Sequence, residues 1–501
     1  MPPPTAPAEQ AAAADLPAYV AVAIIGAGFA GLQAAATLAA AGITDIALLE
    51  AGPAVGGRVR SHPGLAPWPV EAGAEFVHGG NVALRRLLRR AGCTLTEYAW
   101  PDRWWFAGEG CGLVREEKEG GGSWCCFGGR RAQAEATAAD PDLARVHALF
   151  AGVGAEAEPD PNTPDPSARA WLVGTHAASP RQVAIAEACY VNDFGADLES
   201  LGRRELGIEN RLWDAGEAYL VSDKPLAAVA AHMAARLPAG RVRTGWPVAG
   251  VRVEGEEGSG SVLLTGPGGV TLRAGTAIIA VPLAVLQAGH IAFDPPLPPL
   301  KREAMARVTV GRAMKVILGF RARFWPPDFF DAVCPGGFVP EFWTVDGAKS
   351  GGGTGEKTAD GIAHVMTGFL AGRFAAAAAA LGEGETVTRA LRQLDAMFGR
   401  AADPAPASAS FVRAHVADWG ADPLALGAYS IPSRGARPGD RAALAAPAGG
   451  GALLFAGEAT HPAVNPCVQA ALETGERAGR EAIARVRRRG VEGRRWWRWR
   501  A

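Results

Sequence analysis

Three glycines within six residues, Gly26, Gly28 and Gly31, constrain the fold of this chain more than any other feature. They follow an uncharged, apolar run at Ala21–Ile25, which predicts a buried strand, and precede an Ala-rich stretch at Leu32–Ala41, which predicts a helix. In such a turn the first glycine permits the tight bend, and the second lets the backbone approach a pyrophosphate. The third lets the helix pack on the sheet. Because a helix N-terminus offers unpaired N–H groups to phosphates, the pattern predicts dinucleotide binding rather than a glycine-rich packing turn.

A second strand, Ile46–Glu50, completes a strand–helix–strand unit of about 30 residues. Such a unit predicts a parallel sheet with a right-handed crossover, and therefore an α/β fold. Glu50 ends this strand 19 residues after Gly31. A carboxylate at this position accepts hydrogen bonds from ribose hydroxyls and repels a 2′-phosphate.

Later segments supply similar short strands, at Thr276–Val281 and Ala452–Ala456, and a helix at Val468–Arg485. We therefore expect a discontinuous nucleotide domain and a second, mixed domain for the substrate. The expected division is a flexible tail at 1–17, a nucleotide-binding domain at 18–95, 225–300 and 441–484, a substrate domain at 96–224 and 301–440, and a basic tail at 485–501. Three low-complexity stretches are expected to be surface loops: Gly120–Gly122, Glu156–Asp165 and Asp346–Gly361.

Composition excludes several classes of protein. A hydrophobic fraction of 49% excludes disorder over most of the length, and 50 Lys+Arg against 51 Asp+Glu exclude a globally basic nucleic-acid binder. Seven scattered cysteines without a CxxC motif make a zinc site or a disulfide framework unexpected, so no metal is predicted. The uncharged run 16–44 is long enough to span a bilayer, but its glycines favour a strand, a turn and a helix. Without a recognisable leader or peroxisomal signal, the expected location is cytoplasmic.

The 485–501 segment is rich in Arg and Trp. We expect a solvated, frayed terminus; weak contact with a membrane surface or a nucleic acid is the alternative.

The pair Gly56-Gly57 precedes Arg58, eight residues after Glu50, where a guanidinium can pair with a phosphate oxygen. Here the chain resembles the flavin-containing amine oxidases, the family of polyamine oxidases, monoamine oxidases and lysine-specific histone demethylases. The resemblance continues, in the family's order, through four further blocks: Glu71-Ala-Gly-Ala-Glu-Phe-Val-His78-Gly, Ile278–Leu286, Ala417–Ser430 and Leu454–His461. It implies a two-domain α/β flavoprotein with a discontinuous Rossmann-type FAD-binding domain and a mixed α+β substrate domain.

The resemblance also implies which residues hold FAD. Glu50 would hold the ribose, Arg58 the pyrophosphate side, Val248 the adenine and Glu458 the ribityl and phosphate chain. Monoamine oxidases attach their flavin through a cysteine where this chain has Ala428, so the FAD is expected to be non-covalent. The expected cofactor-binding residues are Gly26, Gly28, Gly31, Glu50, Gly57, Arg58, Gly73, Ala74, Val248, Trp419, Gly457, Glu458 and Val468.

Lys315 lies in an apolar, strand-like run, where burying a charge without a partner is costly. The chain has only six Lys against 44 Arg, so a surface cation would more often be Arg. The resemblance implies a catalytic lysine here, bonded through water to the flavin N5 atom. An outward-facing lysine on an alternating strand is the alternative.

Three residues are expected to contact the substrate. Tyr429 matches one wall of the family's aromatic cage, and Cys467 stands where monoamine oxidases have the second tyrosine, so the cage is expected to be half built. His78 matches a histidine beside the polyamine in animal-type polyamine oxidases. Ordinary structural roles are the alternatives for Trp419, Tyr429 and His78.

We therefore expect FAD-dependent oxidation of a small amine, with a polyamine favoured, to an imine and an aldehyde. O2 would be the electron acceptor and would be reduced to H2O2. No long helical insertion occurs mid-chain, which disfavours histone demethylation, and we find no arginine context typical of L-amino-acid oxidases. The alternatives are oxidation of a monoamine or an amino acid, C–C desaturation, and FAD binding without oxidase activity.

Overall fold

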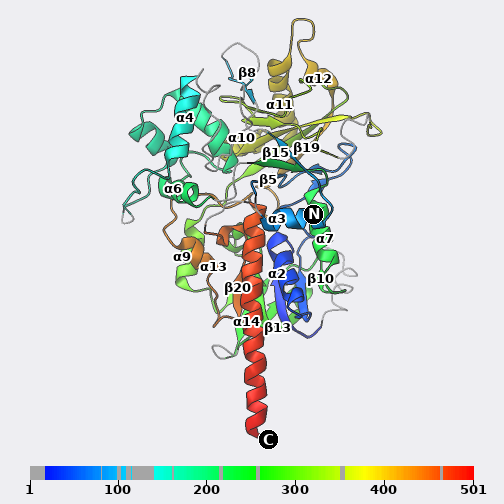
Figure 1. Ribbon diagram of the computed structural model, residues 1–501, viewed down its shortest axis with the longest axis vertical. Coiled ribbons are helices and arrows are strands. Elements are labelled where there is room, and N and C mark those ends of the chain that lie inside the picture. Colours follow the sequence, from blue (N-terminus) through cyan, green and yellow to red (C-terminus); the bar gives the residue numbers. More distant parts are fainter. Residues whose placement is uncertain are drawn as a thin grey trace.

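A computed structural model of the chain describes residues 17–80, 82–98, 103–108, 114–115, 140–160, 163–213, 218–255, 260–349, 356–462 and 467–500. Two sheets organise these residues, one in each half of the molecule as drawn in Figure 1. Within these ranges, none of the helices combines the length and the apolar character needed to cross a bilayer.

The first sheet has eight strands in the order β10-β2-β1-β13-β12-β11-β14, with β20 beside β13. Its strands are β1 (Tyr19–Ile25), β2 (Ile46–Leu49), β10 (Val242–Arg243), β11 (Gly250–Glu254), β12 (Ser261–Thr265), β13 (Thr271–Ile279), β14 (Ala292–Asp294) and β20 (Leu453–Phe455). The strand β1 pairs in parallel with β2 and β13, and β13 pairs in parallel with β20. The four predicted strands are thus confirmed. β13 begins earlier than predicted because its first residues pair antiparallel with β12.

The helix α2 (Phe29–Ala40) follows the glycine turn, and α14 (Val468–Arg500) packs along it. Glycines on α14 make this close packing possible. An added Cβ at Gly475 would lie 2.2 Å from the carbonyl oxygen of Ala30, and one at Gly479 would lie 2.9 Å from Cβ of Thr37. Both predicted helices are confirmed, but α14 runs 15 residues beyond the predicted end at Arg485.

The beginning of the basic segment is anchored, which corrects the expectation of a frayed terminus for residues 485–489. Arg485 is 6% exposed and donates hydrogen bonds to the carbonyl oxygens of Gly260 and Gly450. Arg489 donates to the carbonyl oxygens of Gly260 and Gly275. These guanidinium groups bind carbonyl oxygens of β13 and of the turns beside the first sheet, so α14 is anchored to this sheet as far as Arg489.

The second sheet has seven strands in the order β19-β15-β18-β17-β16-β7-β8. Its strands are β7 (Arg103–Trp104), β8 (Val114–Arg115), β15 (Ala313–Phe320), β16 (Asp331–Val333), β17 (Glu341–Trp343), β18 (His364–Ala371) and β19 (Phe411–Asp418). The strand β15, next to the edge strand β19, is buried along its whole length because helices cover one of its faces and the cavity described below lies at the other.

Helices surround this sheet on two sides (Figure 1). Apolar residues of β15 pack against α10 (Gly372–Leu381), α11 (Glu383–Phe398) and α12 (Pro406–Ser410). A second cluster joins β16 and β17 to a helical lobe, which contains α4 (Pro141–Gly152), η2 (Ala170–Thr175), α5 (Pro180–Ala186), η3 (Glu187–Val191) and α6 (Arg203–Leu212).

Smaller elements connect the two halves. A three-stranded sheet has the order β5-β9-β6, and β3 pairs with β4. The remaining elements are β3 (Ser61–His62), β4 (Val70–Glu71), β5 (Phe76–His78), β6 (Leu95–Tyr98), β9 (Tyr219–Ser222), α3 (Val82–Arg90), α7 (Leu226–Ala235), α8 (Leu283–Gln287), α9 (Pro299–Arg307), α13 (Asp440–Ala445), η4 (Pro267–Gly269) and η5 (Glu458–Thr460).

Two of the expected surface loops are partly buried. Asp165 is 5% exposed, and its carboxylate accepts a hydrogen bond from the backbone N–H of Arg204 at the start of α6. Asp346 and Lys349 are 3% and 4% exposed, and the Lys349 ammonium donates to the carbonyl oxygen of Ser222. Composition did not predict this burial, because these polar stretches contain single charged residues that are buried against specific partners. The 120–122 stretch lies outside the described residues.

Candidate active site

A cavity of about 910 Å³ lies between the two sheets. It runs from the glycine turn after β1 to the middle of β15, and it is lined by residues from segments that are far apart in the sequence. All of the site residues expected from the sequence line this cavity except Gly31. Gly31 has a packing role instead, because a Cβ there would lie 1.9 Å from the carbonyl oxygen of Gly26.

The glycine turn forms one end of the cavity. Gly26 has a φ of +99°, and a Cβ on it would lie 2.9 Å from the carbonyl oxygen of Ala280 on the neighbouring strand connection. At Gly28 the surroundings are open, since a Cβ would meet only the carbonyl oxygen of Gly56, at 4.0 Å. The turn therefore combines a fixed backbone with free space over the start of α2, which is the arrangement that a pyrophosphate requires.

The Glu50 carboxylate is held in place beside this turn. Oε2 accepts a hydrogen bond from the backbone N–H of Ala27 at 2.8 Å, and Oε1 accepts one from the backbone N–H of Gly52 at 2.8 Å. Glu50 is 9% exposed and lines the cavity. Since each carboxylate oxygen can accept more than one hydrogen bond, ribose hydroxyls would find fixed acceptors here. The adjacent cavity wall contains Val248, which is buried.

Arg58 and Glu458, both expected at the phosphate side, are paired with each other. The Arg58 Nη1 atom lies 2.9 Å from Glu458 Oε1 and 2.7 Å from the carbonyl oxygen of Ala428. The other Glu458 oxygen accepts a hydrogen bond from the Ser430 hydroxyl at 2.5 Å. Arg441 donates to Ser430 Oγ at 3.1 Å and so extends the network. Sequence reasoning identified the two charges but missed Ser430, which ends the matched 417–430 block, and Arg441, which lies outside the matched blocks.

Gly73 and Trp419 pack together in the next part of the wall. A Cβ on Gly73 would lie 1.9 Å from the carbonyl oxygen of Arg58 and 3.1 Å from Cζ2 of Trp419. The Trp419 Nε1 atom donates to the carbonyl oxygen of Ala72 at 2.9 Å. The indole is thus fixed against the 72–74 backbone, and both elements line the cavity with Ala74.

Lys315 is paired with a carboxylate that sequence reasoning missed. Its Nζ atom lies 2.9 Å from Glu75 Oε2 and 3.1 Å from the carbonyl oxygen of Glu71. The side chains of Lys315 and Glu75 are 7% and 3% exposed, so the ion pair is buried. Glu75 Oε2 also accepts a hydrogen bond from Trp343 Nε1 at 3.0 Å. The alternative of an outward-facing lysine is therefore wrong.

Glu71 adds a second buried carboxyl group at the start of the same segment. It accepts hydrogen bonds from the backbone N–H of Leu226 and from the Ser61 hydroxyl, each at 2.7 Å. Burial raises the pKa of Glu71, and the Lys349 ammonium opposes that rise. Three of the lysines, Lys301, Lys315 and Lys349, are thus buried.

Aromatic side chains line the far end of the cavity. Tyr429 donates its hydroxyl to the carbonyl oxygen of Asp193 at 2.9 Å. The further rings belong to residues that the sequence analysis did not assign to the site: Phe76, Tyr219, Trp343 and Phe369. The Phe76 ring lies 5.0 Å from that of Tyr219 and 5.2 Å from that of Trp343, measured between centroids. Of these four residues, only Phe76 could have been assigned to the site from the sequence, because it lies within the matched 71–79 segment.

His78 and Cys467 lie at this same end. The His78 ring meets Tyr219 edge-on at 4.8 Å, because β5 and β9 pair these two residues directly. Cys467 is 7% exposed and packs beside Trp213. The aromatic wall is therefore more extensive than the half-built cage expected from Cys467, although its rings come from β5, β9, β17 and β18. Asp193 and Glu341 are also among the residues that line the cavity.

The residues of this cavity fit a flavin dinucleotide. The open space over Gly28 and the fixed Glu50 carboxylate suit the pyrophosphate and ribose, and the buried Lys315 and Trp419 lie toward the other end. Val468, at the start of α14, and Gly457, with a φ of +124°, complete the wall between them.

Comparisons with known proteins agree with this geometry. A model of the family described as flavin containing amine oxidoreductase matches residues 29–483. Polyamine oxidase 3 of Oryza sativa subsp. japonica is 33% identical over 227 residues, covering 45% of this chain and 43% of that protein. Lysine-specific histone demethylase 1 homolog 3 of Arabidopsis thaliana is 33% identical over 206 residues, covering 40% of this chain and 12% of that protein. Polyamine oxidase 1 of the same rice is 28% identical over 521 residues, covering 93% and 97%.

Solved structures share the fold over nearly the whole chain. Putrescine oxidase bound to putrescine superposes with a TM-score of 0.71 at 21% identity, covering 93% of this chain and 99% of that one. Cyclohexylamine oxidase from Brevibacterium oxydans gives a TM-score of 0.73 at 21% identity, covering 94% and 99%. The matches with the first two relatives span less than half of those proteins, whereas the family match spans most of this chain. The chain belongs to the flavin-containing amine oxidoreductase family.

Proposed function

We propose that this protein is an FAD-dependent amine oxidase that binds its cofactor without a covalent bond and favours a polyamine or diamine substrate. The observation that carries the proposal is the cavity that joins the glycine turn and Glu50 to the buried Lys315–Glu75 pair and the aromatic wall. A dinucleotide site and an amine site connected in this way suit a redox reaction between the two ligands.

In this proposal each end of the cavity has defined tasks. Gly28, Gly57 and the start of α2 would receive the pyrophosphate, Glu50 the ribose, and Val248 the adenine. Arg58 and Glu458 would hold the chain that links the phosphates to the flavin. Ala428 has no nucleophilic side chain, which supports non-covalent binding. FAD supplies the acceptor for a hydride from the carbon next to the amine nitrogen.

The substrate end combines apolar rings with carboxylates. The reacting nitrogen must be neutral, and the apolar surroundings of Tyr429, Phe76 and Tyr219 disfavour its protonated form. A second, distant ammonium of the same substrate would remain charged beside Asp193 or Glu341. Lys315, held by Glu75, would keep a water molecule in place at the reacting face. Water then hydrolyses the imine to an aldehyde, and O2 takes the two electrons and two protons to become H2O2.

Anaerobic titration of the purified protein tests this proposal. Spermine, spermidine, their N-acetyl forms, putrescine and an aromatic monoamine are added in turn while the visible flavin absorption is followed. We expect rapid bleaching by at least one polyamine or diamine, and slower bleaching by the monoamine. Bound FAD that none of these amines bleaches would contradict amine oxidation and leave desaturation, amino-acid oxidation or FAD binding alone.

A further inference from the structure

The 420–427 segment crosses the cavity wall between the glycine-turn end and Tyr429. Its two ends are tied to the start of β15 and to the residues just before it: the backbone N–H of Trp419 donates to Ala313 O at 3.1 Å, and that of Ala428 donates to Gly311 O at 2.8 Å. Between these points, the backbone–backbone hydrogen bonds of the segment, among described residues, run only to Asp418 and Asp422. Its backbone is therefore bonded to itself, and side chains make its contacts with the first half of the molecule.

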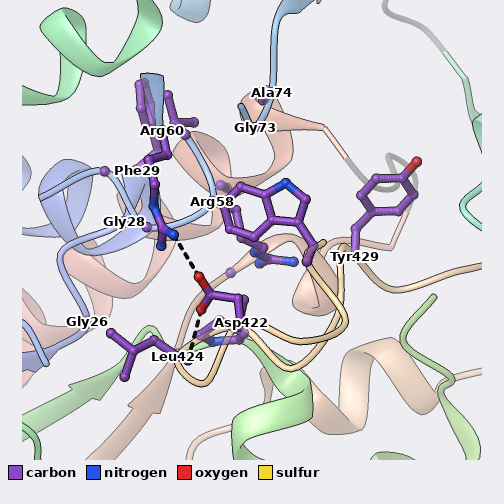
Figure 2. Close-up of a pocket in the computed structure, with 18 of the residues that line it drawn as sticks. Gly26, Gly28, Phe29, Arg58, Arg60, Gly73, Ala74, Asp422, Leu424 and Tyr429 are labelled. Atoms are coloured by element: carbon purple, nitrogen blue, oxygen red, sulfur yellow. Dashed lines mark hydrogen bonds and ion pairs between the residues drawn. The ribbon is translucent and has the colours of Figure 1, made fainter. Parts of the chain in front are cut away.

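The first such contact is an ion pair. The Asp422 Oδ2 atom lies 2.7 Å from Nη1 of Arg60, as Figure 2 shows, and Oδ1 accepts the backbone N–H of Leu424 at 2.9 Å. The Arg60 guanidinium also lies over the Trp419 ring, 4.9 Å from its centroid. Arg60 thus holds the beginning of the segment through two neighbours at once.

The second contact is apolar and lies beside the expected ribose site. A Cβ on Gly52 would lie 3.3 Å from Cδ1 of Leu424 and 3.2 Å from Oε1 of Glu50. Leu424 therefore reaches across to the loop after β2, although its side chain is 40% exposed. An apolar side chain left this exposed while lining a cavity is suited to covering a bound ligand.

The other end of the segment continues into the site. The carbonyl oxygen of Ala428 accepts from Arg58, Tyr429 lines the cavity, and the Ser430 hydroxyl donates to Glu458. One short stretch of chain therefore touches the glycine-turn end, contacts the Arg58–Glu458 pair and presents an aromatic wall to the substrate end.

We propose that residues 420–427 form a strap that retains the dinucleotide cofactor, with Arg60–Asp422 as a polar latch and Leu424 as an apolar cover. The strap must lift for the ligand to enter or leave, because Leu424 leaves no room for even a Cβ on Gly52 without close contact, and both residues line the cavity. The backbone hydrogen bonds of residues 419 and 428 lie at the two ends of the strap and stay intact when it lifts. Only the side-chain contacts of the strap therefore have to break. The identity of the ligand as FAD rests on the proposed function, whereas the strap itself rests on these contacts.

The rate of FAD release from the purified holoprotein tests the strap. The protein is diluted, and the FAD that remains bound is measured at intervals after rapid gel filtration. Asp422→Arg places like charges together, and we expect FAD release to become faster, by about two- to fivefold or more. Arg60→Asp should also make release faster. The double variant, with both substitutions, exchanges the positions of the two charges and should restore slow release. Leu424→Ala tests the cover independently, with release faster by about fivefold.

The matched control is Arg252→Ala, which breaks another exposed ion pair, with Asp294, on the first sheet and away from the strap. Release from this variant should equal that of the wild type. Unchanged release from both Asp422→Arg and Leu424→Ala would overturn the strap, as would a double charge swap that releases FAD as fast as the single variants. Wild-type protein that retains FAD but oxidises no amine would overturn the proposed function. The release rates of the variants would still decide whether the strap retains FAD. Wild-type protein that binds no FAD would overturn both.

Discussion

Arg58 and Glu458 lie 400 positions apart in the sequence and form an ion pair with 2.9 Å between Nη1 and Oε1. Arg58 follows the glycine pair after β2, whereas Glu458 follows β20, so the contact exists only because β20 joins the same sheet, in parallel with β13. The side chain of Glu458 is 5% exposed and that of Arg58 is 25% exposed. The buried carboxylate therefore depends on Arg58 and Ser430 for its partners.

We expect Arg58→Ala to weaken FAD binding by about tenfold or more, because the substitution leaves a buried carboxylate without its cation. Arg58→Lys keeps the charge but loses the planar group that reaches both Glu458 and the carbonyl oxygen of Ala428, so we expect an intermediate loss. Titration of the apoprotein with FAD, followed by flavin fluorescence, measures the Kd. An unchanged Kd for Arg58→Ala would contradict this role.

The Lys315–Glu75 pair allows the stability and the chemistry of the site to be separated. Lys315→Met leaves Glu75 buried and unpaired, and we expect the free energy of unfolding to fall by about 3–5 kcal/mol. The double variant Lys315→Met/Glu75→Gln removes both charges and should regain much of this stability. Amine-dependent flavin reduction should nevertheless remain slow in the double variant. Full turnover in that variant would show that Lys315 is structural.

Glu341 tests the substrate class. Its side chain is 4% exposed and lines the aromatic end of the cavity. If it holds a distant ammonium, Glu341→Gln should raise KM for putrescine by about tenfold or more, since hydrogen bonds to charged groups are the stronger kind. Butylamine, which lacks the second ammonium, serves as the matched substrate and should be unaffected. Equal changes in KM for the two amines would assign Glu341 to the structure of the wall.

His147 makes the folded state sensitive to acid. Burial lowers its pKa to about 3, and its Nδ1 atom contacts the Tyr190 hydroxyl. Between about pH 6.5 and 3 the unfolded chain binds a proton that the folded protein does not, so stability is lost as the pH falls. The His147→Gln variant lacks this titrating group, so its free energy of unfolding should fall less steeply with decreasing pH. We expect the two slopes to differ by up to about 1.4 kcal/mol per pH unit in that range. Urea unfolding at pH 7 and pH 5 measures the difference, and parallel losses would contradict it.

Lys301 has the corresponding effect at high pH. Burial, with a smaller contribution from Arg477, lowers its pKa to about 7, while Nζ donates to the carbonyl oxygens of Ala443 and Leu444 at the end of α13. Above pH 7 the folded protein releases a proton that the unfolded chain keeps until about pH 10, so this group makes stability rise with pH. The stability of the wild type relative to Lys301→Met should therefore increase from pH 7 to pH 9. A constant difference over that range would refute this assignment.

The sequence was sufficient for elements and residues that follow a local pattern. The glycine turn, β1, β2, β20 and the start of α14 were predicted because apolar runs and glycines mark them directly. Lys315 stood out because it is a charge within an apolar strand. These signals concern neighbouring residues, so they do not depend on how the chain folds back.

Partners were harder to predict than positions. The aromatic wall was missed because Tyr219 and Trp343 reach the cavity only through the pairing of β9 with β5 and of β17 with β18. Glu75 belongs to the matched 71–79 segment. However, no feature of the neighbouring sequence distinguishes it from Glu71 as the partner of Lys315. The buried Asp165 and Asp346 were missed for the same reason, because composition records a charge and not the group that satisfies it.

The helix α14 connects the cavity with the opposite end of the molecule. Its first residue, Val468, lines the cavity, and at about 1.5 Å per residue its 33 residues extend for about 50 Å. Figure 1 shows the helix leaving the body of the protein past β13. A fluorophore or a surface tether attached at the last turn would therefore stand far from the reacting atoms. Immobilisation through that end would place the support at the opposite end of α14 from the cavity.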